Sequence, residues 1–244
     1  MDAQPLLYTE LAGWFHLFTH PDDYADEART YERLIRDACP QARTLLELGS
    51  GGGNNAFHLK RSFRCTLSDL SEAMLGASRT INADCEHVHG DMRTLRLSRT
   101  FDAVFVHDAL SYLTSADDLG AALATAFVHT RPGGVALLVP DWTRESFAPG
   151  THAGGHDDGP RGVRHLEWVH EPAPGATTYT VDYALLLRDG DDVRAVADRH
   201  VCGLFPRREW LELLAAAGFE GVKTPPLDPA VHAEQTAFVA RRRA

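Results

Sequence analysis

Residues 44–59 read TLLELGSGGGNNAFHL, a short apolar run followed by four glycines within five positions. Glycine in regular structure costs about 0.5–1 kcal/mol relative to alanine because it loses more backbone freedom on folding. A cluster of glycines after an apolar strand therefore needs a physical reason. Either the glycines make a tight turn, or they allow the backbone to lie against a ligand.

Apolar strands alternate with helical patterns on both sides of this stretch. We expect helices at 22–38, from about 54, from 71 and at 119–129, with Ser71 as a cap, and strands at 44–48, 65–69, 86–91, 101–107 and 135–139. Residues 132–134 predict a turn before the fifth strand. A helix at 206–217 and strands at 219–223 and 236–240 complete the pattern. The sequence thus predicts an α/β fold, a Rossmann-like, doubly wound, seven-stranded, mostly parallel sheet.

The amino-acid composition changes after the fifth strand. Residues 148–162 are rich in Gly, Pro, His and Asp and predict a loop. Three β-like runs at 163–169, 177–187 and 193–203 predict an antiparallel β insertion. We therefore divide the chain into an N-terminal helical lid (1–40), a core (41–141 and 204–244) and a β insertion (142–203). The insertion is expected to cover the site or to form a homodimer contact.

Charge and composition exclude several classes. The chain of 244 residues has 24 Lys and Arg against 34 Asp and Glu, a net charge of −10, which argues against a nucleic-acid-binding face. No apolar run reaches the roughly 18 residues of a membrane span, and no signal-peptide pattern is visible, so we expect a cytoplasmic protein. The scattered cysteines suggest a reducing compartment. They are Cys39, Cys65, Cys85 and Cys202.

The histidines raise a metal hypothesis. His152, His156, Asp157 and Asp158 form a cluster within the glycine-rich loop. His-x3-His spacing places two ligands on one face only in a helix, and this segment is not helical by pattern. The sequence therefore favours a solvated loop and predicts no metal site.

The residues around the glycines distinguish two kinds of ligand. Residues 51–56 match the GxGxxA dinucleotide frame, and Asp69 ends the next strand, where a carboxylate accepts ribose hydroxyls. An NAD-dependent oxidoreductase fits both features. Glu47, however, would repel a pyrophosphate and suits a cationic amino-acid moiety. Asp91 and Met92 follow the third strand, where they could contact an adenine.

Five motifs occur in a shared order: Glu47-x-Gly-x-Gly-x-Gly, LSDLSEAML (67–75), HGDM (89–92), FDAVFVHDALSYL (101–113) and RPGG (131–134). With them the chain resembles the class I S-adenosylmethionine-dependent methyltransferases. Its layout is most similar to bacterial small-molecule enzymes that N,N-dimethylate nucleotide-linked amino sugars. The shared stretches there are DYADEA (23–28), GDMR (90–93) and the segment 199–219.

The resemblance implies that S-adenosylmethionine is the cofactor and assigns residues to it. The loop glycines would approach its methionine portion, Glu47 its ammonium group and Tyr24 its carboxylate. Asp69 would bind the ribose, Met74, Asp91 and Met92 would surround the adenine, and His107 would line the cofactor. The glycines concerned are Gly49, Gly51 and Gly53.

For the methyl acceptor we expect a small-molecule amine or hydroxyl, with N-methylation slightly favoured. Asp108, Tyr112 and His200 are the candidates on the acceptor side, either as a general base or as pocket lining. Because neighbours on a strand face opposite ways, at most one of His107 and Asp108 should reach the acceptor. The alternatives are the NAD-dependent oxidoreductase and an inactive cofactor-binding or dimerising protein.

Overall fold

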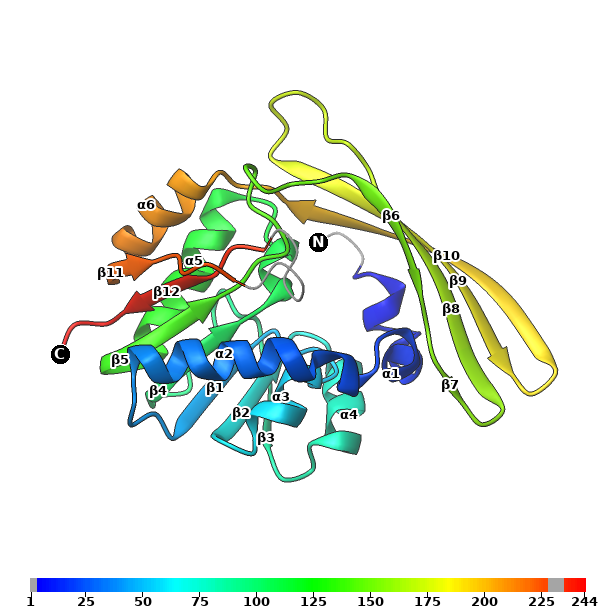
Figure 1. The fold of residues 1–244 in the computed structure, drawn as a ribbon, viewed down its shortest axis with the longest axis horizontal. Coiled ribbons are helices and arrows are strands. Elements are labelled where there is room, and N and C mark those ends of the chain that lie inside the picture. Colours follow the sequence, from blue (N-terminus) through cyan, green and yellow to red (C-terminus); the bar gives the residue numbers. More distant parts are fainter. Residues whose placement is uncertain (1–3, 228–234) are drawn as a thin grey trace.

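A seven-stranded sheet forms the centre of the molecule (Figure 1). The computed structural model describes residues 4–227 and 235–244. The strand order is β11-β12-β5-β4-β1-β2-β3. Strands β1 to β5 pair in parallel, and β12 and β11 add antiparallel pairs at one edge. Their bounds are β1 Thr44–Leu48, β2 Arg64–Asp69, β3 Glu86–His89, β4 Phe101–Val106, β5 Thr130–Leu138, β11 Glu220–Lys223 and β12 Phe238–Arg241. The expected doubly wound α/β fold is confirmed.

Helices cover both faces of this sheet because its central strands are apolar on both sides. Leu45 and Phe105 face α2 (Ala25–Ala38) and α3 (Asn54–Leu59) in one core layer. Leu46 and Val104 face α5 (Ala116–His129) and α6 (Arg207–Ala217) in the other. Helix α4 (Glu72–Ile81) packs on β2 and β3, and the Ser71 hydroxyl caps it by accepting from the Met74 backbone N–H.

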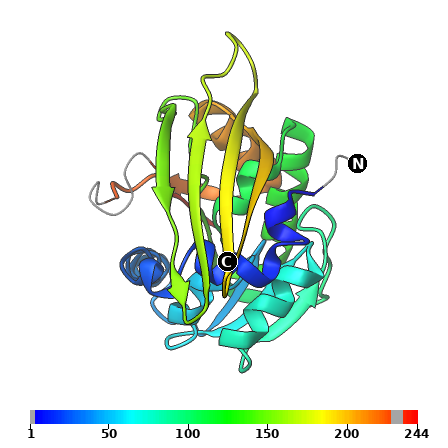
Figure 2. The ribbon, with the colours of Figure 1, turned by 90° about the vertical axis from the view of Figure 1, so that its right-hand side faces the viewer.

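A second, antiparallel sheet stands over the carboxyl ends of the parallel strands (Figures 1 and 2). It comprises β6 (Gly150–Gly154), β7 (Asp157–Asp158), β8 (Arg161–Val169), β9 (Thr178–Asp189) and β10 (Asp192–Gly203). Short helices of the N-terminal segment, η1 (Leu6–Tyr8), η2 (Ala12–Trp14) and α1 (Phe15–Phe18), lie between it and the core. Leu11 and Leu17 of this segment pack on Val163 and Leu185 of the second sheet.

The structure corrects two local expectations. Residues 148–162 are not a loop, because β6 and β7 pair with β8 and place glycines where side chains would collide. The expected turn at Pro132 lies inside β5, where the register against β4 shifts and Gly133 adopts φ +74°.

The described part of the segment expected to be a lid contains helices of two kinds. Tyr31 and Ile35 bury α2 against the sheet, while η3 (Pro21–Tyr24) and the short helices precede it.

One carboxylate ties the starts of three parallel strands together. Asp102 of β4 accepts hydrogen bonds from the backbone N–H of Arg43 and Thr44 and from the Thr44 hydroxyl, each at 2.9 Å. Arg131 of β5 donates to its other oxygen at 2.6 Å. Burial opposes ionisation of Asp102, but these donors hold its pKa well below the usual range. These hydrogen bonds of Asp102, here called the Asp102 clamp, lie at the opposite end of the strands from the second sheet.

We therefore expect Asp102→Ala to lower the free energy of unfolding by about 2–3 kcal/mol, because it leaves partly buried donors without a charged acceptor. Because the Asp102 pKa is depressed on folding, this loss is full at neutral pH and shrinks as the pH falls below about 4. Urea denaturation at pH 7 and at about pH 2.5, well below the unfolded pKa, measures both, with exposed Asp191→Ala as the control. An equal loss at both pH values would contradict the proposed clamp.

Candidate active site

A cavity of about 580 Å³ opens where the N-terminal segment and β10 meet the carboxyl ends of the parallel strands. Most of the residues expected from the sequence line it. They are Tyr24, Glu47, Gly49, Gly51, Asp69, Met74, Asp91, Met92, His107, Asp108 and Tyr112. The volume is in the range that buries a ligand of cofactor size. Two expected residues, Gly53 and His200, lie outside the lining.

The glycine loop takes its shape from left-handed backbone conformations. Gly49, Gly51 and Gly53 have φ values of +69°, +53° and +77°. A Cβ on Gly49 would lie 2.3 Å from the Ala109 Cβ, and one on Gly53 would lie 2.3 Å from Asn82. Two of the three glycines therefore allow the loop to pack on its own chain. Gly51 has more room, because a Cβ built on it would lie 3.6 Å from the Met74 side chain, an ordinary contact distance.

Asp69 holds this loop at the end of β2. Its carboxylate accepts from the backbone N–H of Gly51 and of Ser71, both at 2.8 Å. Burial raises its pKa, and these two bonds oppose the rise. Each oxygen retains a second lone pair, so Asp69 joins the loop to the start of α4 and still presents acceptor capacity to the cavity.

Glu47 is a buried acid with unmet hydrogen-bonding capacity. Glu47 lies near the end of β1 and is 3% exposed. Its Oε2 has no hydrogen-bond partner. Burial, with smaller contributions from Cys85, Asp69 and Glu27, raises its pKa well above the usual range. A cationic group in the cavity would satisfy Oε2 and favour the charged carboxylate.

Several acidic side chains lie close together beyond the end of β4. Asp108 lines the cavity, hydrogen-bonds Asp141 and lies 3.2 Å from the His107 Nε2. Glu27 of α2 lies 3.9 Å from the same nitrogen. Burial, and then the Glu27 charge, raises the pKa of Asp108 to about 7, and burial also raises those of Glu27 and Asp141. The Asp108 side chain is 41% exposed and lines the cavity.

His107 and Asp108 do not face opposite ways as the strand rule predicts. Strand β4 ends at Val106, and a 3-10 turn, η4 (Asp108–Tyr112), starts directly after His107. Both side chains therefore line the cavity. The hydroxyl of Tyr31, a core residue, lies 2.9 Å from His107 Nε2. His107 is therefore fixed between the core and these acidic side chains.

Asp91 carries a partner that the sequence pattern did not suggest. Arg93 donates to both of its carboxylate oxygens, at 2.6–3.0 Å, and also contacts Asp118. The Arg93 guanidinium holds the pKa of Asp91 below its usual range. An adenine contact by Asp91 would therefore use the acceptor capacity that Arg93 leaves.

Tyr112 lines the cavity, whereas His200 does not. His200 is 1% exposed, and its Nδ1 lies 2.7 Å from the Tyr112 hydroxyl. The Tyr112 hydroxyl is also 2.7 Å from that of Tyr8 in η1, which lines the cavity. His200 thus does not contact a ligand directly.

Sequence reasoning missed several residues in or next to the cavity. Asn54 and Asn55 are buried at the start of α3, and each has an oxygen without a hydrogen-bond partner. The two consecutive amides directly after the glycines could have identified them. Asp141 follows β5 as Asp108 follows β4, and this repetition could have identified it. Glu27 and Arg93 lie in the shared stretches 23–28 and 90–93, which gave no role for either residue, and Tyr8 has no such pattern around it.

Comparisons with known proteins agree with this arrangement. Residues 45–134 match a family model described as a methyltransferase domain. The chain is 35% identical over 199 residues to dTDP-3-amino-3,4,6-trideoxy-alpha-D-glucopyranose N,N-dimethyltransferase of Streptomyces venezuelae, covering 80% of this chain and 83% of that enzyme.

The chain belongs to the S-adenosylmethionine-dependent methyltransferases. This methyltransferase is also 31% identical over 198 residues to dTDP-3-amino-3,6-dideoxy-alpha-D-glucopyranose N,N-dimethyltransferase of Streptomyces fradiae, covering 80% of this chain and 77% of that enzyme. It is an N-methyltransferase of small molecules, and S-adenosylmethionine is its methyl donor.

Solved structures show the same fold. The crystal structure of Streptomyces venezuelae DesVI superposes with a TM-score of 0.83 at 30% identity, covering 96% of this chain and 98% of that one. The sugar N-methyltransferase KedS8 from a Streptoalloteichus species gives a TM-score of 0.81 at 25% identity, covering 100% and 96%. The methyltransferase therefore shares the fold over its length, second sheet included.

The described part of the chain holds neither a metal-ligand cluster nor a membrane-spanning helix. Within residues 4–227 and 235–244, no three His, Cys, Asp or Glu side chains converge as metal ligands would. In the same residues no helix combines the length and apolar character needed to cross a bilayer.

The raised pKa of Asp108 generates a stability prediction. Folding shifts this pKa from about 3.8 to about 7, so the folded state retains a proton that the unfolded state releases, and stability falls as the pH rises through this window. Asp108→Asn should therefore raise Tm relative to wild type at pH 8 and not at pH 4, by about 2–4 °C for each kcal/mol recovered. Thermal unfolding without ligand measures this. A difference that does not change with pH would contradict it.

Proposed function

We propose that this methyltransferase transfers methyl groups to the amino nitrogen of a deoxysugar. The cluster of Glu27, Asp108 and Asp141 carries the proposal, because three partly buried carboxyls with raised pKa values, one of which lines the cavity, favour a cationic guest such as an ammonium group. The relatives from two Streptomyces species are named for nucleotide-linked amino sugars, which supports this class of acceptor.

For the cofactor we infer that Glu47 receives the ammonium group of its methionine portion. The unpartnered Oε2 beside Gly49 and Gly51 supports this placement. Asp69 would receive the ribose hydroxyls, and Met74, Asp91 and Met92 would surround the adenine. Tyr24 would approach the carboxylate, and His107 would line the cofactor on its acceptor side. When bound, S-adenosylmethionine supplies a methyl group activated by its sulfonium charge.

On the acceptor side, Asp108 would hold the ammonium group and Tyr112 would line the pocket. His200 would act through its hydrogen bond with Tyr112 and not by touching the acceptor. Fixing the amine near the methyl group converts a bimolecular reaction into an effectively unimolecular one, which is worth up to about 7–11 kcal/mol. Gly53 acts through structure alone, because it starts α3 against Asn82 and Ser78.

The cofactor assignment predicts the effect of Glu47→Gln. The substitution retains shape and removes the charge, so S-adenosylhomocysteine should bind about 10- to 100-fold more weakly, since a hydrogen bond to a charged group contributes roughly 1.5–3 kcal/mol. Isothermal titration calorimetry measures the change, with exposed Glu212→Gln as the matched control and NAD as the control ligand. Unchanged affinity, or heat with NAD alone, would refute the assignment.

The acceptor class is tested with three sugars: a dTDP-linked amino sugar, the free amino sugar and the matching dTDP-sugar with a hydroxyl in place of the amine. We expect the first to gain one or two methyl groups by mass spectrometry and the hydroxyl analogue to gain none. Methylation of the hydroxyl analogue at the same rate would contradict an amine-specific site.

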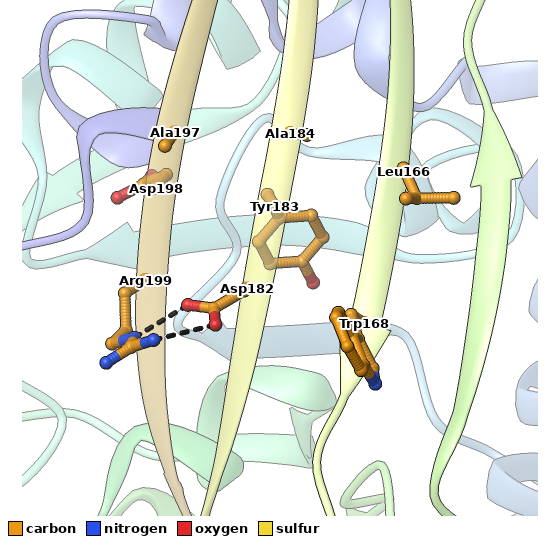
Figure 3. Close-up of a pocket in the computed structure, with 8 residues that line it drawn as sticks. All are labelled: Leu166, Trp168, Asp182, Tyr183, Ala184, Ala197, Asp198 and Arg199. Atoms are coloured by element: carbon orange, nitrogen blue, oxygen red, sulfur yellow. Dashed lines mark hydrogen bonds and ion pairs between the residues drawn. The ribbon is translucent and has the colours of Figure 1, made fainter.

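We also infer a homodimer formed by the outer face of the second sheet. Of the eight large hydrophobic side chains exposed among the described residues, five lie on this face. They are Leu166, Trp168, Leu186, Val193 and Val201. Figure 3 shows Trp168 on β8 beside the Asp182–Arg199 ion pair that joins β9 to β10. Mixed aromatic, aliphatic and Arg surfaces are typical of protein interfaces, and a twofold axis would pair this face with itself.

The dimer predicts that Trp168→Glu yields a monomer of 26.8 kDa where wild type has twice that mass. Trp168 is 56% exposed, so the change should leave the fold intact. Light scattering coupled to size-exclusion chromatography measures the mass, with Leu211→Glu on α6 as an exposed control elsewhere. A monomeric wild type would remove this inference without affecting the proposed reaction.

A further inference from the structure

Four side chains form a continuous hydrogen-bonded chain that leads from the cavity into the second sheet. The Tyr8 and Tyr112 hydroxyls lie 2.7 Å apart, and the Tyr112 hydroxyl lies 2.7 Å from His200 Nδ1. His200 Nε2 in turn lies 3.1 Å from Asp198 Oδ2. Both tyrosines line the cavity, whereas His200 and Asp198 are 1% and 8% exposed.

Asp198 fixes the direction of every hydrogen bond in this chain. Burial opposes its ionisation, but hydrogen bonds from His200 and from the Leu7 backbone N–H, the latter at 2.8 Å, hold its pKa below the usual value. A carboxylate only accepts, so His200 Nε2 carries the proton and Nδ1 of the neutral ring is an acceptor. Tyr112 therefore donates to His200.

The direction of the hydrogen bond between the two tyrosines follows in the same way. Because the Tyr112 proton points to His200, the Tyr112 oxygen accepts from Tyr8, and the Tyr8 proton points away from the cavity. Tyr8 thus presents lone pairs and no proton to whatever occupies the cavity. An N–H donor complements this surface, and a group that only accepts does not.

We propose that the chain from Tyr8 through Tyr112 and His200 to Asp198 removes the proton that an acceptor ammonium group must lose before it is methylated. This rests on the proposed function, since it requires an amine acceptor. One N–H bond of the ammonium breaks, and its electron pair stays on nitrogen as the nucleophilic lone pair.

The protons then balance along the chain. The departing proton passes to the Tyr8 oxygen, the Tyr8 proton passes to Tyr112, and the Tyr112 proton passes to His200 Nδ1. The resulting imidazolium lies beside the Asp198 carboxylate, and the Glu167 carboxyl also faces it. Burial raises the pKa values of Tyr8 and Tyr112, so neither tyrosine holds a negative charge and the proton moves on to His200. Dimethylation uses the chain twice, and between the two transfers the proton on His200 returns along the same hydrogen bonds to solvent in the cavity.

In this chain Tyr8 is the catalytic residue and Asp198 is a positioning residue that acts through His200. Asp198 also anchors the segment that carries Tyr8, through the Leu7 N–H. Asp198→Asn keeps one acceptor oxygen for that N–H, removes the charge and replaces the second oxygen with an amide that donates. Tyr112→Phe interrupts the chain in the middle. Tyr183→Phe is the matched control, because its ring lies 4.7 Å from His200 while its hydroxyl donates to Glu167, outside the chain.

The first experiment measures kcat, the acceptor KM and S-adenosylhomocysteine affinity for these three variants with an amino-sugar acceptor. We expect Asp198→Asn and Tyr112→Phe to lower kcat about 10²-fold, as for loss of a general base, with both binding constants retained. Tyr183→Phe should keep the wild-type kcat. The deficit should shrink as the pH is raised through the ionisation of the amine itself, because the acceptor then arrives without its extra proton.

The second experiment needs no turnover. Nitrogen-15 NMR of the wild-type protein reports the His200 tautomer, with His200→Gln identifying its signals. We expect the proton on Nε2. A proton on Nδ1, a wild-type kcat in Tyr112→Phe, or a deficit that does not depend on pH would each overturn the proposal. If wild type methylates no amine, the proposed function fails, and the tautomer still decides the direction of the chain.

Discussion

The cost of keeping carboxyl groups out of water governs this structure. Around the cavity, burial raises the pKa of each of these acids: Glu27, Glu47, Asp69, Asp108 and Asp141. All but Glu27 lie at or just after the carboxyl ends of parallel strands, where starts of helices also meet and favour negative charge. A cofactor with an ammonium and a sulfonium group, together with an amine acceptor, offsets this cost. Ligand binding therefore stabilises the fold, by an amount set by the ligand concentration relative to its Kd.

The central fold could be predicted because its signals are local. The expected strand at 44–48 matches β1, and Ser71 caps α4 as its position before Glu72 indicates. The position of three acids at one edge of the sheet was equally accessible, since Glu47 and Asp69 end successive strands, Asp91 follows the next, and the fold alone brings strand ends together. The period of the apolar residues and the topology rule place these acids side by side, and their assignment to the cofactor, which the family resemblance implies, stays a proposal.

The remaining features depend on contacts between distant segments. Residues 148–162 form strands because β8 supplies their partners, and a glycine-rich composition hides this. His107 and Asp108 share the cavity because β4 ends one residue earlier than its apolar run suggested. The Tyr8–Tyr112 contact spans 104 positions, and the Leu7–Asp198 contact spans 191. No pattern within one window of sequence could reveal such pairs.

The charge of the cavity also constrains how an acceptor enters. A phosphate group placed among Asp108, Glu27 and Asp141 would meet like charges at close range, which costs far more inside a protein than in water. The cationic residues that line the cavity are Arg93 and Arg199, and both already pair with acids. An acceptor that carries both an amine and a phosphate would therefore enter amine first and leave its phosphate towards Arg199 at the edge of β10. For the proposed amine acceptor, these acids would thus set its orientation as well as favour its charge.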